Sequence, residues 1–150
     1  MSNGFISKTA LIIILIAVFG GLFIYRYLSS KEPLVKENDQ SNQKEDLIRV
    51  TNPKPNEIIK SPYSVRGEAR GNWFFEASFP VRLVDSNGKI LILTFAQAQG
   101  EWMTTDFVPF ESSLSFEIPE TEAGELILQK DNPSGLPEYD DEIVIPVRFR

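Results

Sequence analysis

Residues 71–98 read GNWFFEASFPVRLVDSNGKILILTFAQA, and this stretch decides the fold. Two apolar runs flank Asp85-Ser86-Asn87-Gly88, and an Asn-Gly pair readily supplies the positive φ angles of a tight hairpin turn. The first run predicts a long strand with Phe74 on one face and four apolar residues on the other: Trp73, Phe75, Ala77 and Phe79. The stretch therefore predicts an antiparallel β-hairpin.

The second run of this hairpin, residues 89–98, is apolar on both faces. A strand of that kind is typical of the centre of a sheet, where both faces are covered. In the first run, Pro80 lacks a backbone N–H and indicates a bulge or an edge position. We therefore expect the second strand to be central and the first to be locally exposed at Pro80.

The rest of residues 47–150 continues this period-two pattern. Short alternating runs recur, and nine of the ten prolines of the chain punctuate them. No stretch shows a convincing amphipathic helix, and turn signals recur about every ten residues, as in β-sandwiches. The pattern predicts an all-β fold, an immunoglobulin-like antiparallel β-sandwich of seven or eight strands. Gly67 and Ala69 give one strand a face of small residues, over which we expect Trp73 to pack.

The N-terminal part of the chain has a different character. Ala10 to Ile24 carries no charge, and seventeen uncharged positions separate Lys8 from Arg26. As a helix, residues 5–28 would extend about 36 Å, enough to cross a hydrocarbon core of roughly 30 Å. The run is longer than a secretory signal and lacks an Ala-x-Ala site, although Ser29-Ser30 leaves cleavage open as an alternative. We expect a transmembrane anchor at residues 1–28 that contacts the lipid bilayer.

Residues 29–46 read SSKEPLVKENDQSNQKED and bury almost nothing apolar. Such a composition cannot offset the entropy of ordering, so it predicts a flexible tether with a reach of about 25 Å. The expected organisation is an anchor at 1–28, a linker at 29–46 and a β-sandwich domain at 47–150.

Composition excludes several classes of function. Histidine and cysteine are absent, which removes a Ser-His-Asp triad, a thiol nucleophile, His or Cys metal ligands and lipid attachment at a lipobox. Residues 47–150 hold ten basic and sixteen acidic residues, and this charge repels nucleic acids. We expect no enzyme activity, no cofactor, no metal and no nucleic-acid partner.

Several motifs resemble the bacterial spore-germination immunoglobulin-like domain, which is associated with GerMN domains. The motifs are Ser61-Pro62, Val65-x-Gly67-x-Ala69, Gly71 to Ala77, Phe79-Pro80-Val81, Glu101 to Thr104, Phe107 to Phe110, Asn132 to Gly135 and Ile145-Pro146-Val147. The resemblance covers nearly all of residues 48–149. It implies a small β-sandwich outside the cytoplasmic membrane, with a binding or structural role. The chain differs from the germination proteins by lacking a GerMN domain and a lipobox cysteine.

The orientation across the membrane rests on this resemblance. Arg26, Lys31, Lys36 and Lys44 follow the apolar run, so the positive-inside rule taken literally keeps the domain in the cytoplasm. Long C-terminal domains translocate largely regardless of flanking charge. We therefore expect a single-pass protein of the cytoplasmic membrane with its C-terminal domain outside.

Candidate ligand-binding residues are aromatic or belong to the N-P-S-G motif. Trp73, Phe74, Phe75 and Trp102 suit either a sugar platform or a packed core. Phe74 points away from Trp73 and Phe75 in the predicted strand and is the best candidate for exposure. The predicted ligand-binding residues are Phe74, Trp102, Asn132 and Ser134.

Five acidic residues near the C-terminus provide hard oxygen ligands of the kind that Ca²⁺ prefers: Asp131, Glu138, Asp140, Asp141 and Glu142. Their spacing does not match a D-x-D-x-D-G loop, so a solvated loop is the favoured interpretation.

Two functions remain open. The first is a membrane-anchored module that binds a cell-wall glycan, peptidoglycan or a protein at the bacterial envelope. The second is a structural or assembly partner that pairs with another envelope protein through an exposed strand edge.

Overall fold

The computed structural model describes residues 44–150. The predicted anchor at residues 1–28 and nearly all of the predicted tether lie outside the described residues. Within residues 44–150, no helix is both long enough and apolar enough to cross a membrane.

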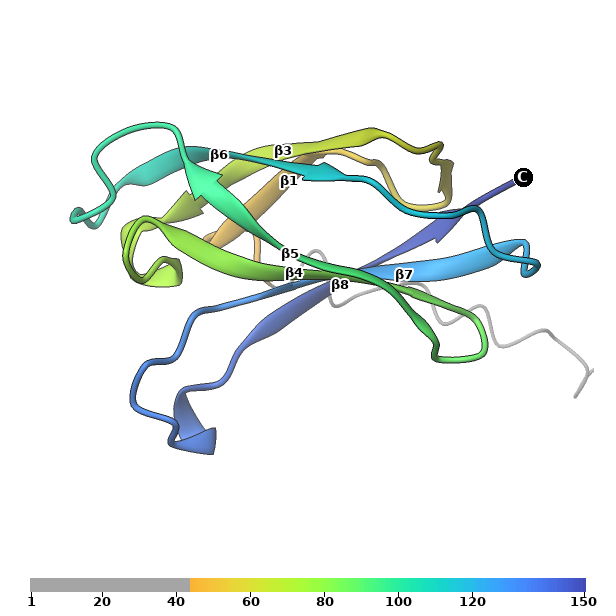
Figure 1. The fold of residues 1–150 in the computed structure, drawn as a ribbon. Coiled ribbons are helices and arrows are strands. Elements are labelled where there is room, and N and C mark those ends of the chain that lie inside the picture. Colours follow the sequence, from red (N-terminus) through yellow and green to blue (C-terminus); the bar gives the residue numbers. More distant parts are fainter. Residues whose placement is uncertain (1–43) are drawn as a thin grey trace, which may run out of the picture. The chain divides into compact units, whose positions relative to one another are not determined.

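The described chain is built almost entirely from strands (Figure 1). Two single-turn 3-10 helices interrupt them, η1 (Gly71–Trp73) and η2 (Pro137–Tyr139). The strands in chain order are β1 (Ile48–Asn52), β2 (Glu57–Ile58), β3 (Tyr63–Arg70), β4 (Ser78–Asp85), β5 (Ile90–Ala98), β6 (Phe107–Leu114), β7 (Ala123–Gln129) and β8 (Glu142–Arg148).

These strands form one curled sheet in the order β1-β3-β6-β5-β4-β7-β8-β2. β1, β3 and β6 make one half of the sheet, and β5, β4, β7, β8 and β2 make the other. The halves are joined by pairing at Gln97 and Ala98 of β5, and Figure 1 shows β5 diverging from β6 away from this junction. The prediction of an all-β, immunoglobulin-like fold is confirmed. The sequence predicts antiparallel pairing throughout, and this detail was wrong, because β2 pairs with β8 in parallel.

The central hairpin forms where its turn residues predict. The Gly88 N–H donates to the Asp85 carbonyl at 2.9 Å, and Gly88 has a φ of 80°. Asn87 does not have a positive φ, so the turn places one residue rather than two in the left-handed region. The Asp85 side chain stabilises this turn by accepting from the backbone N–H groups of Asn87 and Lys89, each at 2.9 Å.

The first run of the hairpin is not one continuous strand. Residues 71–73 form η1, and Glu76 and Ala77 have φ angles of 49° and 64° before β4 begins at Ser78. This turn breaks the period-two alternation that the sequence suggests. As a result both Trp73 and Phe74 are buried, whereas Phe75 is 41% exposed.

The core lies between the two halves of the sheet and is centred on Phe79. The Phe79 ring contacts Phe74 and Phe110 at centroid distances of 5.2 and 5.0 Å and meets Trp73 edge-on at 6.5 Å. The small residue Gly67 pairs with Phe110, whose ring fills the space above it. Phe110, rather than the expected Trp73, therefore packs directly on Gly67.

β5 lies between β6 and β4, as the sequence predicts for a central strand, but its edge toward β6 is only partly paired. It pairs with β4 along its whole length but with β6 only at Gln97 and Ala98. Before this junction Ile90, Leu93 and Phe95 are exposed, whereas Leu91 and Ile92 are partly buried against the core. Pro80 lies where β4 pairs with β5 but not yet with β7, a local edge that tolerates its missing N–H.

Candidate functional site

The predicted aromatic site is only partly present. Phe74 and Trp102 line a shallow depression of about 500 Å³ together with Gly71, Met103 and Thr104. Phe74, however, is only 4% exposed, because the η1 turn rotates it toward Phe79. The prediction that Phe74 is the exposed aromatic was therefore wrong. Its neighbour Phe75 is exposed instead, and Trp102 is half-buried against the core.

Asn132 and Ser134 lie in the loop between β7 and β8 and do not line this depression. The Ser134 hydroxyl donates to the Asn132 side-chain oxygen. The Asn132 amide donates to the Leu136 carbonyl at 2.8 Å and to the Asp140 carboxylate at 2.7 Å. These contacts stabilise the loop from within, so the structure gives Asn132 and Ser134 a local structural role.

The acidic residues of this loop have separate partners. Asp141 pairs with Lys44, and Glu142 pairs with Arg82 at 3.2 Å. Burial raises the pKa of Asp131 above its ordinary value, while its backbone N–H donates to the Trp73 carbonyl at 3.1 Å. Across residues 44–150, no three acidic side chains are grouped to hold a metal ion.

β5 carries three exposed apolar side chains on an uncharged stretch of strand. Ile90, Leu93 and Phe95 are 54%, 59% and 51% exposed, and residues 90–98 carry no charge. On the same face of the neighbouring β4, Val84 pairs with Ile90 and Pro80 pairs with Phe95. Exposed apolar residues that gather in this way mark interaction surfaces more often than isolated ones do.

The backbone of β5 has an unpaired edge beside these side chains. Ala98 donates its backbone N–H to the Ala77 carbonyl, on the β4 side. Backbone groups of successive residues in a strand point to opposite edges, so the N–H and C=O groups of Leu93 and Phe95 point away from β4. The Phe95 carbonyl accepts from the Ser112 hydroxyl at 3.0 Å, and β6 begins to pair only at Gln97. Between Ile92 and Ala96, β5 thus presents a strand edge that is open except at the Phe95 carbonyl.

A bulge borders this open edge. Val84 pairs with Ile90 and Leu83 pairs with Ile92, which leaves Leu91 as an extra residue in β5. Bulges twist a strand edge and limit indiscriminate pairing between molecules. The open edge is therefore short and bounded, by the bulge at one end and by β6 at the other.

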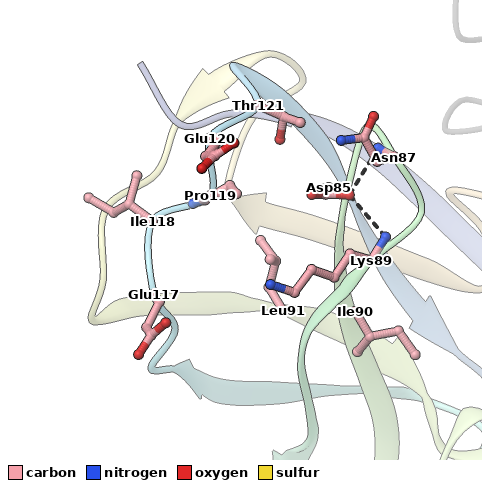
Figure 2. A pocket seen from close by; sticks show the side chains of 10 residues that line it. All are labelled: Asp85, Asn87, Lys89, Ile90, Leu91, Glu117, Ile118, Pro119, Glu120 and Thr121. Atoms are coloured by element: carbon pink, nitrogen blue, oxygen red, sulfur yellow. Dashed lines mark hydrogen bonds between the residues drawn. The ribbon is translucent and has the colours of Figure 1, made fainter.

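Beyond the bulge, the edge leads into a groove of about 600 Å³ between the β4–β5 turn and residues 117–121. Lys89, Ile90 and Leu91 form one wall, and Glu117 to Thr121 form the other (Figure 2). Asp85 lies at the inner end and is 7% exposed. The groove thus has a mainly polar lining that includes three carboxylates, those of Asp85, Glu117 and Glu120.

None of the residues along β5 or this groove was a sequence-predicted site. The available signal was the run of apolar residues on both faces of 90–95, which we interpreted as coverage by neighbouring strands. Which strands meet depends on contacts between residues far apart in the chain, and those contacts leave β5 open. An exposed apolar run and a covered one have the same local pattern.

The architecture now defines the class of protein. A curled all-β sheet of eight short strands around one aromatic core is typical of immunoglobulin-like domains. More specifically, residues 47–135 match the family described as the immunoglobulin-like domain of bacterial spore germination, and the chain belongs to this family. The resemblance inferred from the motifs is confirmed. No curated protein matches the chain.

Proposed function

We propose that this protein is a membrane-anchored, extracytoplasmic module that holds a partner protein at the bacterial envelope by adding a strand of that partner to the open edge of β5. The observation that carries this proposal is the unpaired edge at residues 92–96, flanked by the exposed side chains of Leu93 and Phe95. In strand addition, backbone hydrogen bonds supply affinity, and alternate side chains supply specificity. β5 provides both elements.

The position of the edge and groove supports this role. Lys44, where the described chain begins, bonds to Asp141 and to the Glu142 carbonyl at the start of β8. Arg150, past the other end of β8, donates to carbonyls beside the groove, at Pro119 and Glu120. The groove therefore lies at the end of the domain opposite to the end at which the proposed tether joins.

A protein partner fits the surface better than a glycan does. Of the four aromatic residues that suit a sugar platform, only Phe75 is exposed, because Trp73 and Phe74 are core residues and Trp102 is half-buried. The exposed apolar side chains of β5 instead lie beside unpaired backbone. We expect no catalytic activity, since the candidate surface contains no recognisable nucleophile with an adjacent base.

The test is affinity capture with the full-length chain, extracted from membranes in mild detergent. Leu93→Lys and Phe95→Lys together place two charges on the β5 surface. Because both side chains are about half exposed, we expect folding to be kept and partner capture to fall at least tenfold.

Met103→Lys is the matched control, since Met103 is apolar, 74% exposed and lines a different depression from the groove. We expect its capture to equal that of the unmodified chain. Equal capture by all three proteins would contradict strand addition at β5.

A further inference from the structure

We propose that the partner segment received by β5 carries a lysine or arginine side chain at the end that enters the groove, where Asp85 binds its cation. This inference rests on the proposed function, because it specifies the chemistry of the segment that β5 receives. It follows from three features of the groove: its continuity with the β5 edge, its charge and the state of Asp85.

The groove continues directly from the open edge. Ile90 and Leu91, which line it, precede the edge residues Ile92 to Ala96 in the same strand. A segment paired with Leu93 and Phe95 and running toward the turn therefore reaches the groove within two or three residues. Its next side chain enters between Lys89 and the segment 117–121 (Figure 2).

The charge of the groove selects a cation. Three carboxylates line it, at Asp85, Glu117 and Glu120, against a single ammonium group, at Lys89. Residues 47–150 as a whole carry ten basic and sixteen acidic residues, so the surrounding domain adds to the negative potential. A groove in which one sign of charge predominates attracts ligands of the opposite sign.

Asp85 is the residue best placed to receive the cation. Its Oδ1 accepts the two backbone N–H groups of the turn, at 2.9 Å each. No donor among residues 44–150 is bonded to its other oxygen, Oδ2. Figure 2 shows the Asp85 carboxylate turned toward the space enclosed by Lys89, Leu91 and residues 117–121. Oδ2 is not among the buried side-chain atoms that lack a partner, so it is open to a donor in the groove. Hydrogen bonds to a carboxylate are stronger when the donor is charged.

The experiment uses the full-length chain in detergent and two synthetic peptides of alternating valine and threonine. One peptide ends in lysine, and the other ends in norleucine, which has nearly the same shape without the charge. We measure the affinity of each by fluorescence anisotropy and the protection of the β5 amides by hydrogen exchange.

We expect both peptides to protect the Leu93 and Phe95 amides, with the lysine peptide binding at least tenfold more tightly. Asp85→Asn keeps an Oδ1 acceptor for the turn but removes the charge, and we expect it to abolish the tenfold preference. Lys89→Gln removes the competing ammonium and should increase the preference. Glu101→Gln, a carboxylate that does not line the groove, should change neither affinity.

A second variant keeps the test decisive if Asp85→Asn disturbs the turn. Glu117→Gln combined with Glu120→Gln removes two groove carboxylates outside the hairpin and should reduce the lysine preference. Equal binding of the two peptides, with protection of β5, would overturn the cation site while supporting strand addition. Absence of protection with either peptide would overturn both proposals.

Discussion

At the scale of single residues, three aromatic rings packed around Phe79 hold the two halves of the sheet together. Phe79 lies on β4 and Phe110 on β6, so their edge-to-face contact at 5.0 Å crosses the core. Trp73 and Phe74 complete the cluster from the η1 turn. The chain has no cysteine and therefore no disulfide. Aromatic packing takes the stabilising role that the disulfide between the sheets has in antibody domains.

Trp73→Ala should destabilise the domain by about 3–5 kcal/mol, because it removes a large, almost fully buried ring and leaves a cavity. Chemical denaturation followed by circular dichroism measures the loss. Phe75→Ala is the control, since Phe75 is exposed, and it should change the free energy of unfolding much less. Equal losses for the two variants would contradict the placement of these rings.

A polar contact between β2 and β3 gives a prediction about pH. The Glu57 carboxylate accepts the Lys54 backbone N–H at 2.7 Å and the Tyr63 hydroxyl at 2.8 Å. These hydrogen bonds, the backbone one first, lower the pKa of Glu57 from its ordinary 4.5. The contribution of Glu57 to stability is thus complete above pH 4.5 and is lost as the pH falls through the lowered value.

We therefore expect Glu57→Gln to lower the melting temperature most near pH 7, where the contribution of the carboxylate is complete, and by progressively less as the pH falls below 4.5. Melting curves between pH 3 and pH 7 for both proteins measure this difference. Parallel curves throughout that range would show that Glu57 does not titrate with folding.

The residues Phe74 and Phe75 mark what sequence reasoning can and cannot give at this scale. Composition and spacing identify an aromatic cluster correctly. The face on which each ring lies depends on the positive φ angles of Glu76 and Ala77, and neither residue type favours that conformation. An assignment from period-two alternation therefore predicts that Phe74 is exposed and Phe75 is buried, which is the reverse of the structure.

At the scale of elements, β1, β3 and β6 pack closely because Gly67 has no side chain. A Cβ atom there would lie 2.2 Å from the Arg49 carbonyl oxygen and 2.7 Å from the Phe110 ring. The backbone of β1 and an aromatic ring of the core thus both occupy the space that any larger residue needs.

Gly67→Ala should accordingly cost about 1–3 kcal/mol, since β1 or Phe110 must move to relieve the contact. Gly100→Ala is the matched control, because its Cβ would meet only a Val108 methyl group at 4.0 Å. Denaturant titration of both variants tests the difference. A neutral Gly67→Ala substitution would contradict the close approach of β1 and β3.

The hairpin of β4 and β5 was predictable, and the environment of β5 was not. Asp85, Asn87 and Gly88 encode the turn locally, through side-chain acceptors and a left-handed glycine. β5 has an open edge because β6 pairs with it only at Gln97 and Ala98, and this pairing depends on contacts between strands far apart in the chain. The apolar pattern of β5 is the same as that of a central strand paired along both edges.

At the scale of the whole molecule, the two ends of the described domain differ. One end carries Lys44 and the acidic loop between β7 and β8, and the other carries the groove beside β5. The all-β class and the family were predictable because periodicity and motifs extend over the whole domain. The proposed anchor and tether remain predictions from residues 1–46, and the orientation remains a prediction from the family resemblance.

We expect the domain to lie outside the cytoplasmic membrane. Protease added to intact cells, with the outer layers made permeable, should cleave the domain, as followed by an antibody to residues 44–150. A cytoplasmic protein serves as the control for membrane integrity. A domain that is protected in these cells but cleaved after lysis would place it in the cytoplasm, as the positive charges after the apolar run suggest.

The most direct test of strand addition at β5 is site-specific photo-cross-linking in living cells. A photoreactive amino acid replaces Leu93 in the full-length chain, and the same amino acid replaces Met103 in a parallel strain. Our account predicts a discrete protein adduct from position 93 that is absent from position 103. No adduct from position 93, or the same adduct from both positions, would contradict the assignment of the open β5 edge as the binding surface.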